Sequence, residues 1–273
     1  MGDRVTVRID DGVADLRLDR PDKLNALDLA MMRALVESGT AVGADPSVRA
    51  VVLSGEGRAF CAGLDFGGFK SLAGLGKSER PEEPVEGLFD AEQDSPANLA
   101  QRSAFIFQEI SVPVIAAIHG VAYGGGLQVA MAADIRFIAP DARMSIMEVN
   151  WGLVPDMSGT QTLGYHLRLD VIKELTFTGR IVDGAEAVAL GLATHLSDHP
   201  RQDAMAMARK IAGRSPDAVR AAKRLLNRVV CREPAPGLRA EAEIQASLIG
   251  RPNQVEAVVA NLEKRSPSFT DPD

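Results

Sequence analysis

Residues 112–139, VPVIAAIHGVAYGGGLQVAMAADIRFIA, decide the fold. Their pattern predicts a buried strand over 112–120, a short helix after the three glycines, and a second strand over 134–139. Strands that alternate with helices are typical of an α/β protein with parallel crossovers. In such folds ligands bind beyond the carboxyl ends of the strands, which is where these glycines stand.

The segments before this stretch repeat the order of strand, glycine turn and helix. Residues 5–18 alternate apolar and polar positions around Asp11 and Gly12, which predicts a half-buried β-hairpin. A helix is predicted after Asp28, and residues 48–55 are typical of a buried strand that ends at a glycine. We therefore expect several parallel strands whose glycine turns share one edge of the sheet.

The other segments differ from this pattern. Residues 67–96 are rich in Gly, Pro, Ser and charged residues without a sustained period, so we expect a long surface loop there, in the role of a lid. Beyond residue 157 the strand signals fade and helices dominate. Helices are predicted over 158–166, 170–177, 184–190, 200–213, 216–230, 238–249 and 253–265.

Composition argues against several classes of function. The chain has 273 residues, 46% hydrophobic and 25% charged, as in a soluble globular protein. Its formal net charge of −7 argues against nucleic acid and anionic membranes as partners, because both attract basic surfaces. Cys61 and Cys231 lack CxxC spacing, which argues against a disulfide framework or a zinc site and favours a cytoplasmic location. No run approaches the ~18 apolar residues of a membrane span.

The glycines at 124–126 have three interpretations: a phosphate cradle, an oxyanion hole or a tight turn. A dinucleotide-binding fingerprint requires a small residue where this chain has Val129, and no Walker lysine follows. An oxyanion hole needs backbone N–H groups that converge on one oxygen, which glycines at a helix start allow. A second turn, around Gly63 and Leu64, offers another such N–H. Cys61, beside it, has apolar neighbours and is expected to pack rather than to react. From these residues alone, two tight turns remain an alternative.

Five blocks of the sequence, in order, resemble the crotonase superfamily, also called the enoyl-CoA hydratase/isomerase family. They are LDRPDKLNALD (18–28), GRAFCAGLD (57–65), PVIAAIHGVAYGGGLQVAMAADIRFIA (113–139), MEVNWGLVPDMSGT (147–160) and TGRIVDGAEAVALGLATHL (178–196). Together they cover most of residues 5–200 and are far more specific than a single glycine motif. A weaker similarity extends to residues 260–269.

The resemblance implies a fold and a ligand. The fold is a crotonase-like spiral of repeated ββα units over residues 1–196, with a helical C-terminal region over 197–273 that caps the core or builds homotrimers and hexamers. The ligand is an acyl-CoA thioester, with no cofactor beyond the CoA of the substrate. The N–H groups of Leu64 and Gly125 would hold the thioester oxygen. The resemblance also implies substrate contacts at Ala62, Asp65, Gly124, Gln128 and Trp151, with Lys23 and Arg58 near the CoA phosphates.

The residue at position 128 separates two kinds of chemistry in this family. Family hydratases add water with two glutamates, which match positions 128 and 148. Here Glu148 is present, but the other position is Gln128, whose amide cannot exchange protons at neutral pH. Asp156 matches an aspartate of the family's dienoyl-CoA isomerases, which also carry an aspartate where this chain has Gln128. Glu148, with Asp156 as partner, would move a proton between carbons of an unsaturated acyl chain, its pKa raised by an apolar pocket.

Three alternatives remain at this point. Asp156 has the residue type of a cap for the helix expected near Ser158. Hydration of a 2-enoyl-CoA is a second possibility, with Asp156 in place of the missing glutamate. A non-catalytic acyl-CoA-binding or assembly subunit is a third. Gln128 favours double-bond isomerisation of a 3-enoyl- or dienoyl-CoA over hydration.

Overall fold

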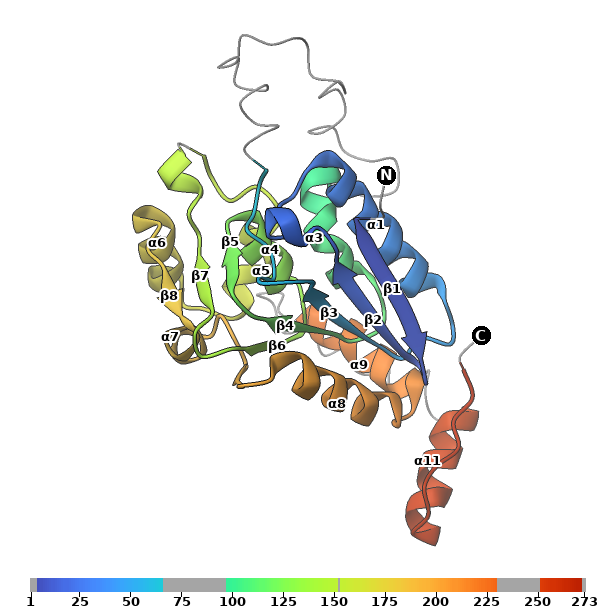
Figure 1. Cartoon of the computed structure of the whole chain (residues 1–273). Helices are drawn as coiled ribbons and strands as arrows, with labels where there is room; N and C mark the ends of the chain where they lie inside the picture. Colours follow the sequence, from blue (N-terminus) through green and yellow to red (C-terminus); the bar gives the residue numbers. More distant parts are fainter. Residues whose placement is uncertain (1–3, 66–96, 152, 230–250, 272–273) are drawn as a thin grey trace.

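The computed structural model describes residues 4–65, 97–151, 153–229 and 251–271, and two sheets form its centre (Figure 1). The six-stranded sheet has the order β1 (Val5–Asp10), β2 (Val13–Leu18), β3 (Ala50–Gly55), β4 (Val114–Ile118), β6 (Ile135–Ile138) and β9 (His195–Leu196). The three-stranded sheet has the order β5 (Val121–Tyr123), β7 (Arg143–Ser145) and β8 (Val182–Asp183).

From β4 to β7 the strands alternate between the two sheets, as expected for repeated ββα units. β4 and β6 pair in parallel in the large sheet, and the strands that follow them, β5 and β7, pair in parallel in the small sheet. A parallel bridge between Cys61 and Ala122 joins the segment after β3 to the small sheet. The α/β class with parallel crossovers is therefore confirmed.

The N-terminal hairpin is confirmed, but its predicted half-burial is wrong. β1 and β2 are antiparallel, and Asp11 and Gly12 between them both have positive φ, as Asp-Gly prefers in a two-residue hairpin turn. Val7 and Ile9 on β1 are 40% and 43% exposed, whereas β2 is buried along almost its whole length. β1 is an edge strand, while β2 is covered by a helix on each face, α1 (Leu29–Ala44) and α8 (Pro200–Ala212), so burial follows position in the sheet rather than alternation along the chain.

Helices cover both faces of the large sheet. α1 (Leu29–Ala44) and α3 (Leu99–Glu109) belong to the larger apolar cluster, and α8 (Pro200–Ala212) packs on the opposite face. α8 meets the strands through Ala204, Ala208 and Ala212. These are spaced four apart and therefore form one stripe, whose small side chains let the helix lie close to the sheet.

The predicted helices are found within a few residues of their expected bounds. They are α4 (Gly125–Met131), α5 (Gly159–Thr162), α6 (Leu169–Thr178), α7 (Gly184–Leu190), α9 (Pro216–Val229) and α11 (Pro252–Glu263), with short 3-10 segments η1 (Pro21–Lys23), η2 (Glu148–Trp151) and η3 (Leu163–Tyr165). The loop expected over 67–96 and the helix expected over 238–249 lie outside the described residues.

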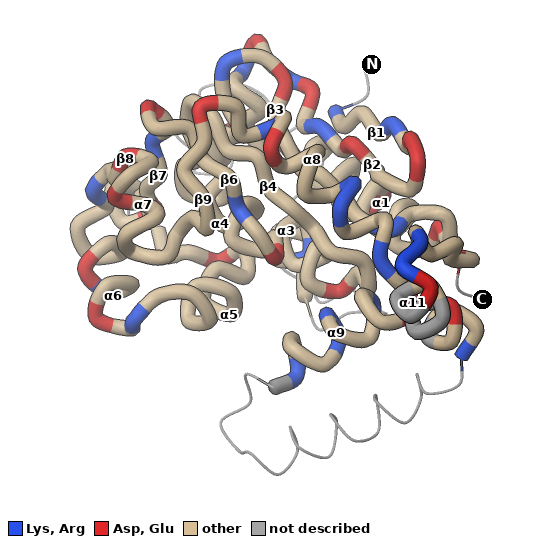
Figure 2. The backbone as a smooth tube through the Cα atoms, turned by 90° about the horizontal axis from the view of Figure 1, so that it is seen from below, with Lys and Arg blue, Asp and Glu red and all other residues tan. Residues whose placement is uncertain are grey.

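A buried ion pair ties α9 to the core. Lys223 Nζ lies 2.8 Å from Asp134 Oδ2 and donates to the carbonyls of Phe107 and Val112 at 2.8 and 3.0 Å. Elsewhere, charged residues of both signs are interspersed along the described backbone (Figure 2). None of the helices within the described ranges is long and apolar enough to cross a membrane.

Candidate active site

The two predicted oxyanion turns lie against each other. Cys61 N donates to Val121 O at 3.0 Å, and Cys61 O accepts from Tyr123 N at 3.1 Å. Cys61 is thereby paired with Ala122. Leu64 and Gly125 each stand three residues beyond this pair, so the paired segments carry both to one place. A Cβ built on Gly63 would lie 3.6 Å from Gly125 N, which shows how closely the turns approach.

Both backbone amides are available to a ligand. Gly125 is the first residue of α4, so its N–H has no acceptor within the helix. The residues on either side of Leu64 both bond to Leu27, at 2.8 and 2.9 Å, which turns the Leu64 N–H to the opposite side. In the described part of the chain, neither N–H donates to a protein acceptor. The positive φ values of Gly63 (86°) and Gly124 (51°) shape the two turns.

An ion pair between Asp65 and Arg20 stabilises the turn that contains Leu64. Asp65, expected from the resemblance to contact substrate, lies 2.7 Å from Arg20, which also approaches Asp28 at 3.4 Å. Ala62 in the same turn donates its N–H to Leu24 O at 2.9 Å. These contacts fix the backbone on both sides of Leu64.

Cys61 has the packing role expected of it. Its Sγ donates to Asn25 O at 3.1 Å, and complete burial raises the pKa of the thiol to about 12, so no thiolate nucleophile forms at neutral pH. Among the described residues, no group of three or more His, Cys, Asp or Glu side chains is placed to hold a metal ion.

Glu148, at the start of η2, presents a buried carboxylate to the Gly125 turn. Its side chain is 8% exposed, and a Cβ built on Gly124 would lie 3.5 Å from Oε1. Oε1 accepts a hydrogen bond from Gln128 Nε2 at 2.6 Å, while Oε2 has no partner in the described structure. Burial raises the pKa of Glu148 and the charge of Asp156 adds to this, whereas hydrogen bonds from its own backbone and from Gln128 oppose it. The result is a carboxylate with one oxygen held and one free.

Gln128 joins three segments and has only one possible orientation. Its Oε1 accepts hydrogen bonds from Met157 N and Gly159 N, both at 2.8 Å. Because backbone N–H groups can only donate, the amide oxygen must face them, and Nε2 must therefore face Glu148. Gln128 is 1% exposed, so this arrangement is sealed from water. The residue positions Glu148 and supplies no exchangeable carboxyl proton.

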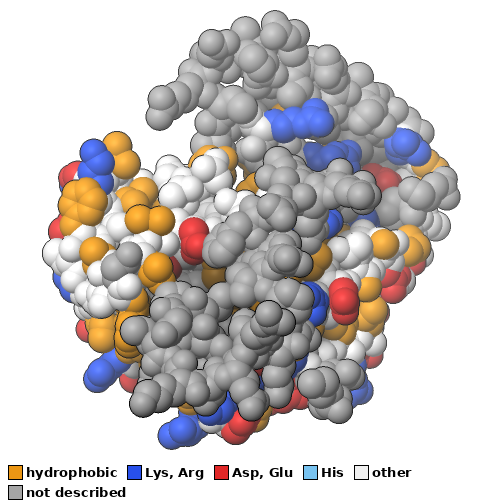
Figure 3. All heavy atoms as spheres, turned by 90° about the horizontal axis from the view of Figure 1, so that it is seen from above, with side chains coloured by type: hydrophobic (Ala, Val, Ile, Leu, Met, Phe, Trp, Pro, Cys, Tyr) orange, Lys and Arg blue, Asp and Glu red, His pale blue; other side chains and the backbone are white. Residues whose placement is uncertain are grey.

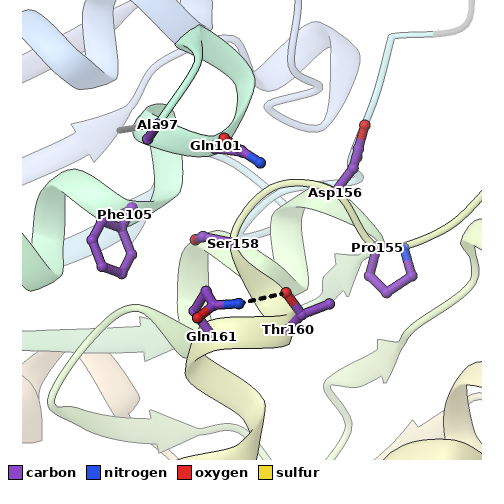
Figure 4. A pocket seen from close by; sticks show the side chains of 8 residues that line it. All are labelled: Ala97, Gln101, Phe105, Pro155, Asp156, Ser158, Thr160 and Gln161. Carbon is purple, nitrogen blue, oxygen red and sulfur yellow. Dashed lines mark hydrogen bonds between the residues drawn. The ribbon is translucent and has the colours of Figure 1, made fainter. Parts of the chain in front are cut away.

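Asp156 lines a cavity of about 400 Å³ between α3 and the segment that leads into α5 (Figure 4). Desolvation by the cavity walls raises the pKa of its carboxyl, although the residue as a whole is exposed. The interpretation of Asp156 as a helix cap is wrong, because the N-cap of α5 is Ser158 and no side chain makes a capping hydrogen bond there. The cavity is lined by Ala97, Gln101, Phe105, Pro155, Asp156, Ser158, Thr160 and Gln161.

The remaining predicted contacts lie at the surface. Lys23 and Arg58 are exposed, and their turns are neighbours, since a Cβ built on Gly57 would lie 2.6 Å from Pro21. Trp151 is 52% exposed at the end of η2 and does not line the cavity. Their roles in CoA and acyl binding stay predictions.

Asp156 is the cavity residue that the sequence predicted; Ser158 and Gln101, which bring unused polar groups to the cavity, were not predicted. Ser158 has a left-handed backbone (φ 67°), and its buried hydroxyl has no hydrogen-bond partner in the described structure. Gln101 lies in the first turn of α3, where its Oε1 accepts from Asn98 N at 3.0 Å. A serine before a helix reads as an ordinary N-cap, and a glutamine three residues after an asparagine reads as a capping box, so neither pattern indicates a cavity.

Comparison with known proteins identifies the family of this chain. The family model described as "Enoyl-CoA hydratase/isomerase" matches residues 8–272. A human protein named "Enoyl-CoA hydratase domain-containing protein 2, mitochondrial" is 34% identical over 270 residues, covering 95% of this chain and 86% of that protein. Mouse "Methylglutaconyl-CoA hydratase, mitochondrial" is 32% identical over 265 residues, covering 94% of this chain and 79% of that protein.

Solved structures show the same likeness. The crystal structure of an enoyl-CoA hydratase from Bacillus anthracis has a TM-score of 0.87 and 30% sequence identity, and covers 98% of this chain and 100% of that one. Likeness over nearly the whole length, in both sequence and fold, makes this chain an enzyme of the enoyl-CoA hydratase/isomerase family, the crotonase superfamily.

Proposed function

We propose that this enzyme moves a double bond along an unsaturated acyl-CoA thioester, converting a 3-enoyl- or dienoyl-CoA into a conjugated isomer. One observation carries the proposal. The buried Glu148 carboxylate has a free oxygen beside the Gly125 turn, and its nearest side-chain partner is the amide of Gln128 rather than a second carboxyl group. An isomerase needs one group that accepts and returns a proton, whereas hydration by the family's two-carboxylate mechanism needs two.

The steps follow from the atoms present. The N–H groups of Leu64 and Gly125 bind the thioester oxygen, and Glu148 removes a proton from C2 of the 3-enoyl group. The electron pair moves onto the thioester oxygen, where the two N–H groups stabilise the enolate. Protonated Glu148 then returns the proton to C4, and the double bond ends between C2 and C3. Every step is a proton transfer, so the CoA of the substrate is the only coenzyme the reaction uses.

Hydration is the second candidate, because several relatives are named as hydratases. Gln128 cannot donate the proton that the second glutamate of a hydratase handles. Asp156 is the carboxylate left to do so, and its charge already acts on Glu148. The two functions therefore differ in what Asp156 does.

The test is an assay of the purified enzyme with crotonyl-CoA, a 3-enoyl-CoA and a 3,5-dienoyl-CoA in deuterated water, followed by ultraviolet absorbance and mass. We expect a shifted double-bond absorbance from one of the last two, without added water. A product from crotonyl-CoA that is heavier by one water, with no change in the other thioesters, would replace isomerisation by hydration. Binding without any product would leave the non-catalytic alternative.

We also propose that the enzyme assembles as a homotrimer or hexamer, and that the η2 and α6 surface contributes to the interface in addition to the C-terminal region over 197–273 that the resemblance implies. This surface exposes Trp151 (52%), Val154 (71%), Leu169 (64%) and Phe177 (71%). Figure 3 shows hydrophobic side chains on the flank where α6 lies. Apolar patches of this kind commonly mark interfaces, and the resemblance implies trimers of a single chain. The occupant is therefore a second copy.

Replacing Phe177 with Glu is expected to shift the molar mass measured by light scattering from the trimer or hexamer to the monomer. Ile9→Glu is the control, because Ile9 is a 43% exposed hydrophobic residue on the edge strand β1, away from α6. A wild-type protein that is monomeric at micromolar concentration would contradict the assembly. The cytoplasmic location stays a prediction, and both relatives named above carry "mitochondrial" in their names.

A further inference from the structure

The cavity beside Asp156 contains a buried hydroxyl that nothing in the described protein satisfies. Ser158 is 8% exposed, its Oγ has no hydrogen-bond partner, and it lines the cavity. Its left-handed backbone, at φ 67°, is costly for a residue other than glycine. A strained residue with an unpaired buried hydroxyl points to a ligand that would pair with it.

Two further polar groups line the same cavity, one a hydrogen-bond donor and the other an acceptor. The Oε1 of Gln101 accepts from Asn98 N at 3.0 Å, which leaves the Nε2 donor for the cavity, and Figure 4 shows this side chain extending from α3 into it. Asp156 brings an acceptor, a carboxylate that forms no ion pair within the described residues. Thr160 and Gln161 instead bond to each other at 3.1 Å. The cavity thus offers a donor, an acceptor and a hydroxyl that acts as either.

Ligand pockets are usually lined by apolar side chains with few polar groups, and this lining departs from that rule. A hydrocarbon chain would leave the Gln101 N–H and the Ser158 hydroxyl without a partner, and only the exposed Asp156 would keep water. A carboxylate-bearing chain would face the negative charge of Asp156. An ammonium group would satisfy Asp156 but leaves the Gln101 N–H without an acceptor. A hydroxyl both donates and accepts, so it alone among these groups satisfies both neighbours.

We propose that the substrate is an acyl-CoA whose chain carries a hydroxyl group beyond the reacting carbons, and that this hydroxyl binds between Asp156, Ser158 and Gln101. The proposal rests on the acyl-CoA function above and specifies its substrate class. The cavity is next to the reacting centre, because Ser158 lies between Met157 and Gly159, whose N–H groups bind Gln128. Gln128 in turn binds Glu148 at 2.6 Å.

Binding of saturated thioesters tests the proposal without requiring turnover. Calorimetry would compare hexanoyl-CoA with hexanoyl-CoA hydroxylated at C4, C5 or C6, and with adipyl-CoA, which ends in a carboxylate. We expect the best hydroxylated thioester to bind about 10-fold more tightly than hexanoyl-CoA, because the net gain from one hydrogen bond corresponds to about a factor of ten in affinity. Adipyl-CoA is expected to bind most weakly.

Variants separate the pocket from general effects on the fold. Ser158→Ala leaves the strain of the positive φ unchanged, since alanine is no better suited than serine to that conformation. The variant is expected to reduce the hydroxyl preference to about 3-fold or less. Thr160→Ala is the matched control, because it removes a hydroxyl from the same cavity that already has a partner in Gln161. It is expected to keep the full preference. Asp156→Asn is expected to bring adipyl-CoA closer to hexanoyl-CoA.

The outcomes distinguish this proposal from the one it rests on. Hexanoyl-CoA that binds as tightly as every hydroxylated analogue overturns the pocket assignment and leaves the acyl-CoA function standing. Failure of all thioesters to bind overturns both. A hydroxyl preference that Ser158→Ala removes, in an enzyme that hydrates rather than isomerises, supports the pocket and overturns only the proposed reaction.

Discussion

Replacing Glu148 with Gln is expected to lower kcat by roughly 10²–10⁴-fold, the range that a positioned acid–base group contributes. KM for the thioester should change little, because the N–H groups of Leu64 and Gly125 are unaltered. The new amide keeps the shape of the carboxylate, and its oxygen can still accept from Gln128 Nε2. The variant therefore removes proton transfer while leaving the surrounding contacts in place.

Steady-state kinetics on the isomerised thioester measure this effect. Glu186→Gln is the control, because Glu186 on α7 pairs with Arg180 on the surface at 2.7 Å and its substitution should leave kcat unchanged. Retained activity in Glu148→Gln would show that another group moves the proton, with Asp156 as the first to examine. In the wild type, kcat/KM should fall as the pH is lowered through the raised pKa of Glu148, since only the ionised form accepts a proton.

Glu148→Gln is expected to lower activity but not stability. The folded pKa of Glu148 lies above its unfolded value of about 4.3, so the folded state binds this proton more tightly. Its contribution to stability is full below that unfolded pKa and is lost as the pH rises through the folded pKa. Glu148→Gln should therefore melt at the same temperature as the wild type or higher near neutral pH. Thermal melts across this pH range would show it.

Local patterns predicted most of this fold because its elements follow one another in short units. Two strands with a glycine turn and a helix between them are predicted within residues 112–139 from periodicity, and β4, α4 and β6 are found there, whereas the short strand β5 of the second sheet was not predicted. Burial in the hairpin could not be read in this way. Val7 and Ile9 are exposed because β1 is the edge of the sheet, a fact that depends on which strand pairs with β2 on its other side.

The candidate site likewise contains features set by the local sequence and features set by contacts between distant segments. The position of the two glycine turns was predictable because they consist of backbone whose shape glycines allow, and glycines are visible in the sequence. The orientation of Gln128 was not, since it is set by the N–H groups of Met157 and Gly159, about thirty residues further along the chain. The unpaired hydroxyl of Ser158 depends on a left-handed φ at a position where sequence suggests an ordinary helix start. Contacts between distant segments decide these features.

Gly63→Ala is expected to reduce kcat/KM by roughly 10²–10³-fold, the cost of losing one oxyanion donor. A Cβ at this position would lie 2.5 Å from Tyr123 O, a backbone atom that cannot move aside without disturbing β5, and φ is 86°. The turn must change shape, and the Leu64 N–H that follows it would leave the position where it meets Gly125.

Gly191→Ala provides a closely matched control for strain. Gly191 has φ 93°, and its Cβ would lie 2.5 Å from another backbone oxygen, that of His166, at the end of α7. Both variants should lose stability, of order 1–3 kcal/mol for the forced backbone alone. Only Gly63→Ala should lose activity in the folded enzyme, because only its turn carries an N–H of the proposed oxyanion hole. Equal loss of kcat/KM in the two variants, measured well below their melting temperatures, would mean that the Leu64 N–H does not bind the thioester oxygen.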